Sequence, residues 1–492
     1  MKQKQTTVMI VLLAIAMITV PIASAGVTAF NVAPTTTTCD TNSSYTVQVN
    51  TTGFESLNIT IPAGYTAVVP EGVYTVNITW INTTTGLGGQ NNTEMITLSG
   101  GGTYVSGFIS TNTTWTLTGS PYIVIGDVIV EEGVELTINP DVIVKFDSGK
   151  SLIIDGILNA RGNAANKIVF TSNATTPASG DWGTIKFRDS SVDSACIIDW
   201  AIVEYGSTGI TCEDSSQIGS PRIENTVIKH NNIGVKITTT HPPHIAGPLI
   251  KNSAISNNSG NAVYIDAGAV NITGTTIQDN DGWGIKTSGA INAIYIIDSA
   301  IQNCSAGGVY GEYITLTGCT IAENGGNGVS GWVDVIISKS IIKSNIGHGV
   351  HHWGSHGLIN IIQILIQNNT GTGIDCGSAT QVFIEYSVIT DNGQSGISND
   401  GGAVHYNNIH YNNIRNNTIY NFKNGGSSDV NATYNWWGTI NTTLIDQHIY
   451  DYYDDYNLGK VTYVPFLTEP VTPENQPPNA SFTFSPSHPV TG

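Results

Sequence analysis

The chain has 492 residues, of which only 11% are charged, and its acidic residues outnumber the basic ones 37 to 18. A formal net charge of −19 repels phosphate backbones, and no basic stripe runs along the sequence, which argues against nucleic acid as a partner. One compact core rarely holds a chain of this length, so we expect several domains or a repeat architecture.

Residues 1–25 have the pattern of a secretory signal peptide. Lys2 and Lys4 precede an apolar run over residues 8–20, and residues 23–25 (Ala-Ser-Ala) offer a small-residue cleavage site. An uncleaved membrane anchor is the alternative, although the run is short for a span of about 20 residues. We therefore expect an extracellular or cell-surface location, with membrane attachment only through an uncleaved signal or an unseen C-terminal anchor.

The exported part contains about sixteen Asn-x-Ser/Thr sequons, which are candidate glycan acceptors and predict a glycoprotein. A sequence this rich in Asn and Thr also produces sequons by chance. They include Asn42, Asn58, Asn77, Asn112, Asn173, Asn271 and Asn431.

Residues 26–118 are rich in Thr and Asn and show no long repeat. Segments such as 57–61 (Leu-Asn-Ile-Thr-Ile) and 74–78 (Tyr-Thr-Val-Asn-Ile) alternate between apolar and polar residues, as half-buried strands do. This part is predicted to form a small β-sandwich-like domain.

A repeating unit dominates residues 119–433 and is clearest between about 200 and 400. Every 20 to 28 residues an aliphatic residue is followed three positions later by Asn and then by Gly with Ile or Val, as in Ile277, Asn280, Gly284 and Ile285. Short strands with Gly and Asn corners predict an all-β stack of about 10–12 coils, each paired in parallel with the next. The Asn column comprises Asn231, Asn258, Asn280, Asn324, Asn345, Asn369 and Asn392.

The Asn column is interpreted as structural, because a carboxamide satisfies both backbone N–H and C=O groups at a sharp corner and bonds its neighbours along the stack. A second column of small hydroxyl residues runs from Thr226 to Ser387. Cys304 and Cys319 occupy these two columns and are expected to be buried small residues. Cys212 and Cys376 share a column but lie seven coils apart, too far for a disulfide; the sequence leaves the pairing of Cys39 and Cys196 open.

These coils, with the closing segment 434–438 (Tyr-Asn-Trp-Trp-Gly), resemble the right-handed parallel β-helix superfamily. The nearest group is the carbohydrate-binding and sugar-hydrolase type, including NosD-like copper-associated proteins of archaeal and bacterial surfaces, and an archaeal source is expected. The resemblance implies a C-terminal cap over 434–468, and residues 469–478 form a Pro-rich linker. Residues 479–492 resemble the opening of a polycystic-kidney-disease-type (PKD) domain. The fold is therefore predicted to be a right-handed parallel β-helix preceded by a β-sandwich-like region.

Three carboxylates are weak candidates for catalysis: Asp279, Glu323 and Asp375. Glycoside hydrolysis needs two carboxyl groups about 5–9.5 Å apart, whereas Asp279 and Glu323 lie two coils apart, about 10 Å at the strand spacing. The alternative interpretation is that they are solvated turn residues.

A histidine-rich segment is a candidate copper or zinc site, because imidazoles near a carboxylate suit both metals. His351 and Asp375 are expected to share one outward column, whereas alternation sends His351 and His352 to opposite faces. The candidate ligands are His348, His351, His352 and His356.

Aromatic side chains expected on the surface are candidates for stacking on sugar rings, which present flat apolar faces. Packing beside glycine corners is the alternative explanation. The candidates are Tyr264, Trp283, Tyr310, Trp332 and Trp353.

The acidic stretch 446–455 is a candidate Ca²⁺ site, or a solvated edge that blocks end-to-end strand addition. From these features the sequence favours a non-enzymatic surface scaffold that binds extracellular polysaccharide or surface glycans, with other envelope proteins as further partners. A polysaccharide lyase or glycoside hydrolase is the alternative, and a copper- or zinc-binding NosD-like protein the second alternative.

Overall fold

The computed structural model describes residues 102–471 except for gaps at 214–217, 239–246, 289–291, 355, 378, 380 and 400–405, together with the backbone of four N-terminal strands. The predicted signal peptide and the PKD-like segment lie outside the described residues. The chain divides into two units, of which the first is residues 1–103 with 119–121 and the second is the remainder.

The described strands of the first unit form one antiparallel sheet in the order β2-β1-β3-β4. Their alternating Thr, Asn and aliphatic residues suit a sheet with two different faces. A second sheet, which a sandwich requires, is not among the described residues. The four strands are β1 (Ser43–Thr51), β2 (Leu57–Ile61), β3 (Gly72–Asn82) and β4 (Gly88–Leu98).

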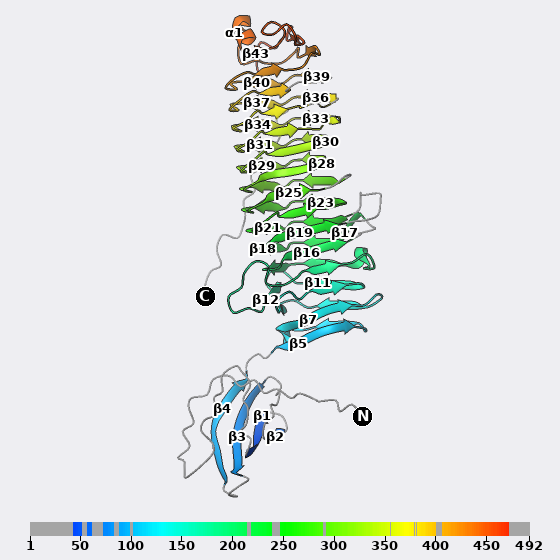
Figure 1. The fold of residues 1–492 in the computed structure, drawn as a ribbon, viewed down its shortest axis with the longest axis vertical. Helices are drawn as coiled ribbons and strands as arrows, with labels where there is room; N and C mark the ends of the chain where they lie inside the picture. The colour runs from blue at the N-terminus through cyan, green and yellow to red at the C-terminus, as the bar shows by residue number, and fades with distance from the viewer. Residues whose placement is uncertain are drawn as a thin grey trace. The chain divides into compact units, whose positions relative to one another are not determined.

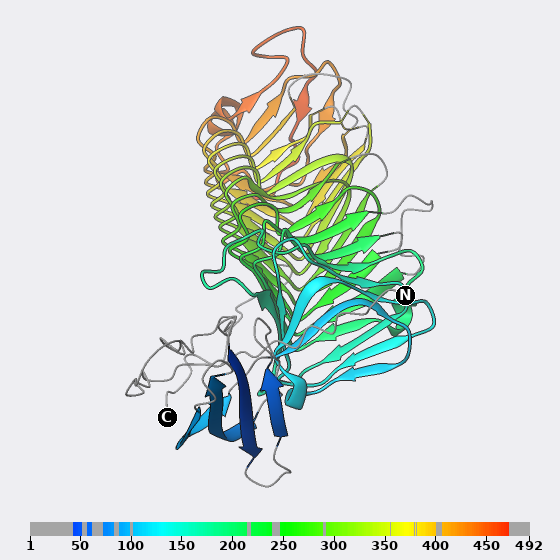
Figure 2. The same ribbon diagram turned by 60° about the horizontal axis from the view of Figure 1, so that its bottom comes forward.

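The second unit is a parallel β-helix of about 13 turns with almost no α-helix (Figures 1 and 2). Each strand pairs in parallel with its counterpart one turn away, which gives three sheets, here called the first, second and third face.

The first face carries the candidate functional residues discussed below. Its strands are β7 (Tyr122–Val130), β10 (Leu152–Ile154), β13 (Ile185–Phe187), β16 (Thr208–Glu213), β19 (Ile233–Thr238), β22 (Val263–Ile265), β25 (Trp283–Thr287), β28 (Gly307–Thr317), β30 (Val329–Ser338), β32 (Val350–His352), β35 (Ile374–Asp375), β38 (Ile397–Asn399), β41 (Phe422–Asn424) and β43 (Ile449–Tyr450).

The second face shares the long strands β28 and β30, which run on from the first face. Its other strands are β6 (Thr113–Trp115), β8 (Glu135–Ile138), β11 (Ile157–Arg161), β14 (Ile197–Asp199), β17 (Ile218–Glu224), β20 (Gly247–Lys251), β23 (Ala269–Thr273), β26 (Ala293–Ile297), β33 (Leu358–Ile362), β36 (Gln381–Glu385) and β39 (Tyr406–His410).

The third face consists of short strands, and from β18 onward each of them buries the residue at its centre. Its strands are β9 (Ile143–Phe146), β12 (Ile168–Ser172), β15 (Ala201–Glu204), β18 (Val227–Lys229), β21 (Ala254–Ser256), β24 (Thr276–Gln278), β27 (Ala300–Gln302), β29 (Thr320–Ala322), β31 (Ile341–Lys343), β34 (Leu365–Gln367), β37 (Val388–Thr390) and β40 (Asn413–Arg415).

The β-helix begins earlier than the sequence indicated. Strands β5 (Thr103–Ile109) and β6 pair with β7 and β8 of the next turn, so the predicted boundary at residue 119 is wrong by one turn. This turn contains Gly107 and Asn112, but it lacks the regular spacing of aliphatic residue, Asn and Gly that marks the repeat, and for that reason the pattern did not reveal it. The extra turn accounts for part of the difference between about 13 turns and the predicted 10–12.

The interior is built from aligned aliphatic columns, as the period-2 pattern predicts. The third-face centres Ile255, Ile277, Ile301 and Ile342 are fully buried, and each lies in register with its neighbour one turn away. Because each turn covers the apolar side of the next, no turn could bury this surface alone.

Two corners of each turn place one residue at positive φ, a conformation that favours Asn, Asp and Gly. The first corner joins the third face to the first and the second corner joins the second face to the third. The first corner comprises Tyr205, His230, Asn257, Asp279, Asn303, Glu323, Ser344, Asn368, Asp391 and Asn416. The second includes Asn225, Asn252, Asp298, Lys339, Tyr386 and Tyr411.

Except after Tyr205, where Gly206 follows, the residue after each first corner belongs to the Asn column, whose side chains are buried and joined into a ladder. Asn345 Nδ2 donates to Asn369 Oδ1 at 2.9 Å and to the Ile321 carbonyl at 3.2 Å. Its Oδ1 in turn accepts from the Asn324 backbone N–H and Nδ2. The same contacts recur along the column, with Cys304 interrupting the series and Asn417 extending it. These side chains form hydrogen bonds with the corner backbone and with one another, which is a structural role.

The hydroxyl column follows the second corner and likewise forms hydrogen bonds with backbone N–H and C=O groups. Each hydroxyl accepts from the backbone N–H of the preceding turn, as Ser253 Oγ does from Thr226 N at 3.1 Å. It donates to a carbonyl two residues earlier in its own turn, as Ser340 Oγ does to Ser338 O at 2.7 Å. Cys319 occupies one position of this column and Cys304 one of the Asn column. The five described cysteines are buried and none forms a disulfide: Cys196, Cys212, Cys304, Cys319 and Cys376.

The C-terminal turns lead into a cap. β43 pairs with β41, so the first face continues past residue 433 into the region predicted as cap. Helix α1 (Thr442–Gln447) and a small sheet of β42 (Val430–Asn431) with β44 (Val461–Thr462) complete it. Within the described part of the chain, no helix is long and apolar enough to cross a membrane.

Candidate functional site

One outward row of the first face gathers most of the chemically distinctive side chains. Register pairs its members turn by turn, from Lys236 through His351 to Tyr450. The row reads Lys236, Tyr264, Lys286, Tyr310, Ser330, His351, Asp375, Ser398, Lys423 and Tyr450. Since adjacent turns lie about 4.8 Å apart, these groups form a continuous strip along the β-helix.

Four of the five predicted aromatic residues form one connected cluster on this face. The Trp332 and Trp353 rings stack with centroids 4.8 Å apart, and Trp353 lies 5.8 Å from Tyr310. Tyr310 in turn lies 5.3 Å from Trp283. Trp332 and Trp353 remain 45% and 43% exposed, so they present apolar ring surface to solvent.

Tyr264, the fifth aromatic residue, sits in the same row, apart from this cluster. Its hydroxyl bonds the Ser288 hydroxyl at 2.7 Å, and Lys236 Nζ lies 6.0 Å from its ring centroid. Lys286 Nζ stands at the same distance from the Tyr310 ring. The row thus alternates cations and rings at the range of cation–π contact.

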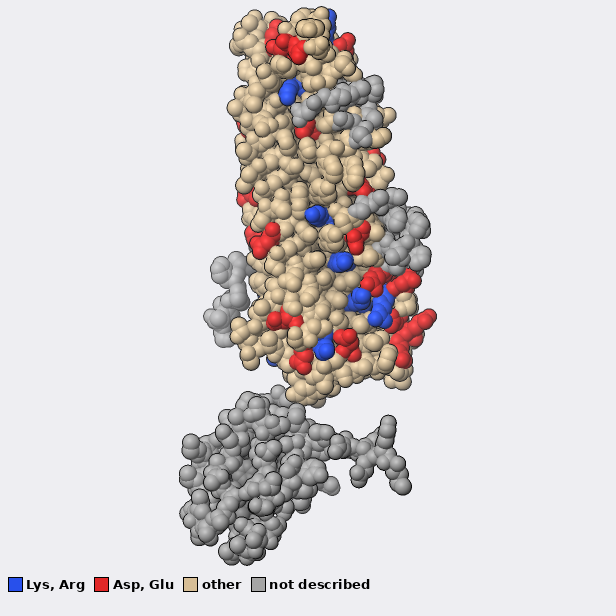
Figure 3. All heavy atoms as spheres, viewed as in Figure 1, with Lys and Arg blue, Asp and Glu red and all other residues tan. Residues whose placement is uncertain are grey.

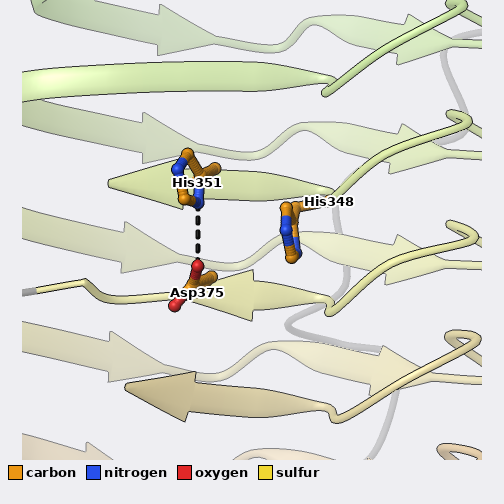
Figure 4. A group of neighbouring side chains, drawn as sticks. All are labelled: His348, His351 and Asp375. Carbon is orange, nitrogen blue, oxygen red and sulfur yellow. Dashed lines mark hydrogen bonds and ion pairs between the residues drawn. The ribbon is translucent and has the colours of Figure 1, made fainter. Parts of the chain in front are cut away.

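A His–Asp cluster adjoins these rings, with His351 in the same turn as Trp353 and Asp375 one turn further on (Figure 4). His351 Nδ1 and Asp375 Oδ2 are 2.8 Å apart, and the His348 ring stacks on His351 with centroids 5.0 Å apart. Asp375 is 3% exposed. Burial alone would raise the pKa of Asp375, but the hydrogen bond from His351 and the charges of both histidines lower it below its ordinary value.

The hydrogen bonds assign different roles to the two imidazoles. Because an ionised Asp375 only accepts, His351 carries its proton on Nδ1 and keeps a lone pair on Nε2. The Thr372 backbone N–H donates to His348 Nδ1 at 3.1 Å, which places the proton of a neutral His348 on Nε2. His351 therefore offers an acceptor, at Nε2, to a polar ligand.

A pocket of about 150 Å³ opens beside this cluster. Ser398 Oγ bonds Asp375 Oδ1 at 3.4 Å and connects the pocket to the His–Asp pair. Hydroxyl, amide, imidazole and ammonium groups share its wall with the apolar surface of Ile419 and Tyr420, which suits a ligand that has both hydroxyl groups and C–H faces. The wall consists of His348, Thr372, Gln394, Ser395, Ser398, Ile419, Tyr420 and Lys423. Sequence reasoning missed this pocket, although Ser398 and Lys423 continue the outward row of the repeat.

The structure brings only part of the predicted metal set together. His348, His351 and Asp375 offer ligand atoms within 4.8 Å of one another. His352 instead points inward, is fully buried, and places Nε2 2.9 Å from the Val333 carbonyl, while His356 lies exposed outside the cluster. Both Nδ1 atoms of the cluster already take part in hydrogen bonds, and a metal that bound through these two atoms would have to displace them.

The three candidate carboxylates do not converge. Asp279 and Glu323 occupy first-corner positions with φ of 55° and 58°, exposed and two turns apart. Asp375 lies on the first face in a different row. Their corner geometry explains Asp279 and Glu323 without catalysis.

The acidic stretch of the cap binds its own backbone. Asp451 is 4% exposed and accepts from the backbone N–H groups of Val461 and Tyr453. Asp454 accepts from Asp451 N, and Asp455 accepts from Asn457 N. These contacts define a tight cap, and they explain the acidic residues without Ca²⁺.

Acid should destabilise the β-helix through His352. Burial lowers the pKa of His352, and the nearby His351 lowers it further, against the Val333 carbonyl, Asp334 and Asp375, which raise it. The imidazole of the unfolded chain has the higher pKa and is therefore protonated first as the pH falls. This group leaves the free energy of unfolding unchanged above about pH 6.5 and decreases it as the pH falls below that value. Asp375, whose pKa is lowered from its ordinary value, stabilises the folded chain throughout this pH range and loses that contribution only at much lower pH.

The measurement is the free energy of unfolding between pH 7.5 and 5 for the natural chain and for His352→Leu. The pH dependence should be smaller in the variant, since leucine at this position has no group to protonate. An equal slope in both proteins would refute this role of His352.

Two family models match the chain. The pectate-lyase-like β-helix domain matches residues 107–218, and the right-handed β-helix region matches residues 245–362. The matches and the parallel coils support the right-handed β-helix superfamily. None of the curated proteins compared with the chain matches it.

Several solved structures resemble the chain at low identity. The periplasmic alginate epimerase AlgG is 10% identical with a TM-score of 0.38, over 70% of this chain and 76% of its own. The Azotobacter vinelandii mannuronan C-5 epimerase AlgE4 A-module is 12% identical with a TM-score of 0.30, over 75% and 89%. The Agl-KA catalytic domain is 11% identical with a TM-score of 0.33, over 88% and 85%. At these scores the comparisons do not transfer an activity to this chain.

Proposed function

We propose that the first face binds an extracellular carbohydrate chain and that the protein is a surface scaffold. The observation that carries this proposal is the stacked, half-exposed pair Trp332 and Trp353 with Tyr310 beside it. Sugar rings offer flat C–H faces to such platforms, and aromatic anchors dominate binding energies at many interfaces. The His–Asp cluster and the neighbouring pocket then supply hydrogen bonds to sugar units further along the bound carbohydrate.

The site row carries the cations Lys236, Lys286 and Lys423 and one buried carboxylate, Asp375, so its charge is compatible with neutral and acidic glycans. Charged side chains are sparse on the side of the β-helix shown in Figure 3, and those visible gather mainly toward the N-terminal turns. Several basic groups of the β-helix are paired, as Lys186 is with Glu213 at 2.7 Å and Lys229 with Glu204 at 3.3 Å.

The test is retention of the purified full chain on immobilised polysaccharides, acidic and neutral, with and without Ca²⁺. Absorbance of unsaturated products and release of reducing ends are followed in parallel. Retention without turnover supports a binding scaffold. Absence of retention on every glycan of the panel would oppose the proposal and direct attention to envelope proteins as partners.

Catalysis on a bound glycan, by a lyase or glycoside hydrolase, is the second candidate function. His351 favours it, because its Nδ1 is held by the buried Asp375 and its Nε2 keeps a lone pair able to take a proton. Turnover in the same assay, lost in His351→Gln and retained in Glu323→Gln, would establish catalysis at this cluster. Turnover unaffected by His351→Gln would place the chemistry elsewhere.

Copper or zinc is a further candidate ligand of His348, His351 and Asp375, on the grounds that their ligand atoms approach within 4.8 Å. Calorimetric titration with Zn²⁺ and Cu²⁺, compared with His348→Ala, tests it. Binding of one ion that disappears in the variant supports a metal site. Heats unchanged by the substitution would rule it out.

A further inference from the structure

The first corner carries an unusual number of exposed asparagines. Four of its positions are Asn257, Asn303, Asn368 and Asn416, with φ between 53° and 57°. All four are exposed, and their carboxamides form no hydrogen bond with any described residue. Positive φ explains why asparagine is favoured there, but it does not account for the residue two positions after each of them.

Each of the four asparagines begins an Asn-x-Ser/Thr sequon. The middle residue is the buried column residue, and the third is Ser259, Ser305, Thr370 or Thr418, all exposed. Among the other six corner residues, which are Tyr205, His230, Asp279, Glu323, Ser344 and Asp391, only Tyr205 has a hydroxyl residue two positions on. The hydroxyl residue therefore accompanies asparagine rather than the corner itself.

The second corner serves as an internal comparison. It also demands positive φ and also holds asparagines, Asn225 and Asn252, with φ of 48° and 49°. These are followed two positions later by Val227 and Ala254, so neither begins a sequon. At the second corner, where asparagine serves only the backbone geometry, no hydroxyl residue follows it two positions later. The first corner differs in having one after each asparagine.

We propose that Asn257, Asn303, Asn368 and Asn416 are acceptors for N-linked glycans, so that one edge of the β-helix carries a row of sugars. They are separated by two, three and two turns in register, about 10–14 Å at the strand spacing. The inference is independent of the carbohydrate-binding proposal and requires only that the chain is exported.

The reaction is a group transfer from a lipid-linked oligosaccharide. Asn Nδ2 forms a bond to the sugar C1, the bond from C1 to the lipid phosphate oxygen breaks, the lipid phosphate leaves with the electron pair, and the amide loses one proton. An outward carboxamide without a hydrogen-bond partner suits this attack. Asn271 is the contrasting case, because it begins a sequon with Thr273 but its Nδ2 is buried without a partner.

The experiment incubates the folded full chain with an oligosaccharyltransferase and a lipid-linked oligosaccharide, and maps glycopeptides by mass spectrometry. We expect modification at the four corner asparagines and none at Asn271, which should be modified only when the denatured chain is the substrate. Ser305→Ala should abolish occupancy at Asn303 alone.

Two results would overturn the proposal. One is a folded chain that stays unmodified at the corner while a free sequon peptide in the same reaction is glycosylated. The other is modification of the exposed sequon at Asn441, in the cap, without modification of the four corner sites. Unchanged folding of Ser305→Ala by circular dichroism excludes a trivial loss of structure.

Discussion

Asn345→Asp is expected to destabilise the β-helix by about 3–5 kcal/mol, because two buried donors become acceptors. Nδ2 of Asn345 now donates to Asn369 Oδ1 and to the Ile321 carbonyl. A carboxylate oxygen in its place would face two acceptors and carry a charge in a position with no exposed surface. The loss should appear as a lower denaturant midpoint and as faster amide exchange around residues 321–369.

Acid should partly rescue this variant, which distinguishes it from a simple packing defect. Burial raises the pKa of such a carboxyl above that in the unfolded chain, so its protonated form, which can donate one hydrogen bond, is favoured at low pH. Stability of the variant relative to the natural chain should therefore rise as the pH falls. A deficit that is constant between pH 7 and 5 would contradict this account of the ladder.

A substitution at Cys304 tests the same ladder in the opposite direction, by adding an asparagine side chain where one is missing. Cys304 interrupts the Asn column, accepting weakly from Asn280 Nδ2 at 3.9 Å through Sγ, while its own N–H donates to Asn324 Oδ1 at 3.0 Å. Cys304→Asn should restore the side-chain ladder and gain about 0.5–1.5 kcal/mol. Destabilisation by this substitution would mean that the local backbone spacing, and not side-chain chemistry, determines the column.

The repeat predicted the middle of the molecule well because each turn repeats the same physical problem. Positive φ at Asp279, carboxamide contacts at Asn280 and the inward Ile277 recur at fixed intervals, so one sequence can reveal them. The turn of β5 and β6 carries Gly107 and Asn112 outside the spacing of the repeat, so its sequence gives no such signal.

The glycines of the repeat also have a clear structural reason. Gly349 has no positive φ, but a Cβ there would lie 2.6 Å from the Gly373 carbonyl oxygen and 2.8 Å from Ile366 Cγ2. Adjacent turns approach too closely for a side chain at this column. Ala262 replaces glycine at one turn and is fully buried, so local spacing there accommodates one methyl group.

The candidate site was only partly predictable. Strand alternation separates His352 from His351, and register places Asp375 beside His351, both of which follow from the repeat. The stacking of Trp332 on Trp353 and the roles of the two imidazoles depend on side-chain rotamers and on the Thr372 N–H, which no periodicity encodes.

Removing both exposed rings, with Trp332→Ala and Trp353→Ala together, should weaken glycan binding at least 30-fold, equivalent to about 2 kcal/mol. The two rings stack on each other, so each single substitution also removes support from its neighbour and the two effects should not add. Because both side chains are more than 40% exposed, the β-helix itself should keep its stability.

Affinity by calorimetry on whichever glycan the panel retains checks this, with thermal unfolding as the control for folding. Tyr456→Ala is the matched control, since Tyr456 is 79% exposed and lies in the C-terminal cap, away from the first-face cluster. Trp353→Phe should keep most of the affinity, because a phenyl ring preserves a flat apolar surface. Equal affinities for the double variant and the natural chain would show that the ligand binds away from this face.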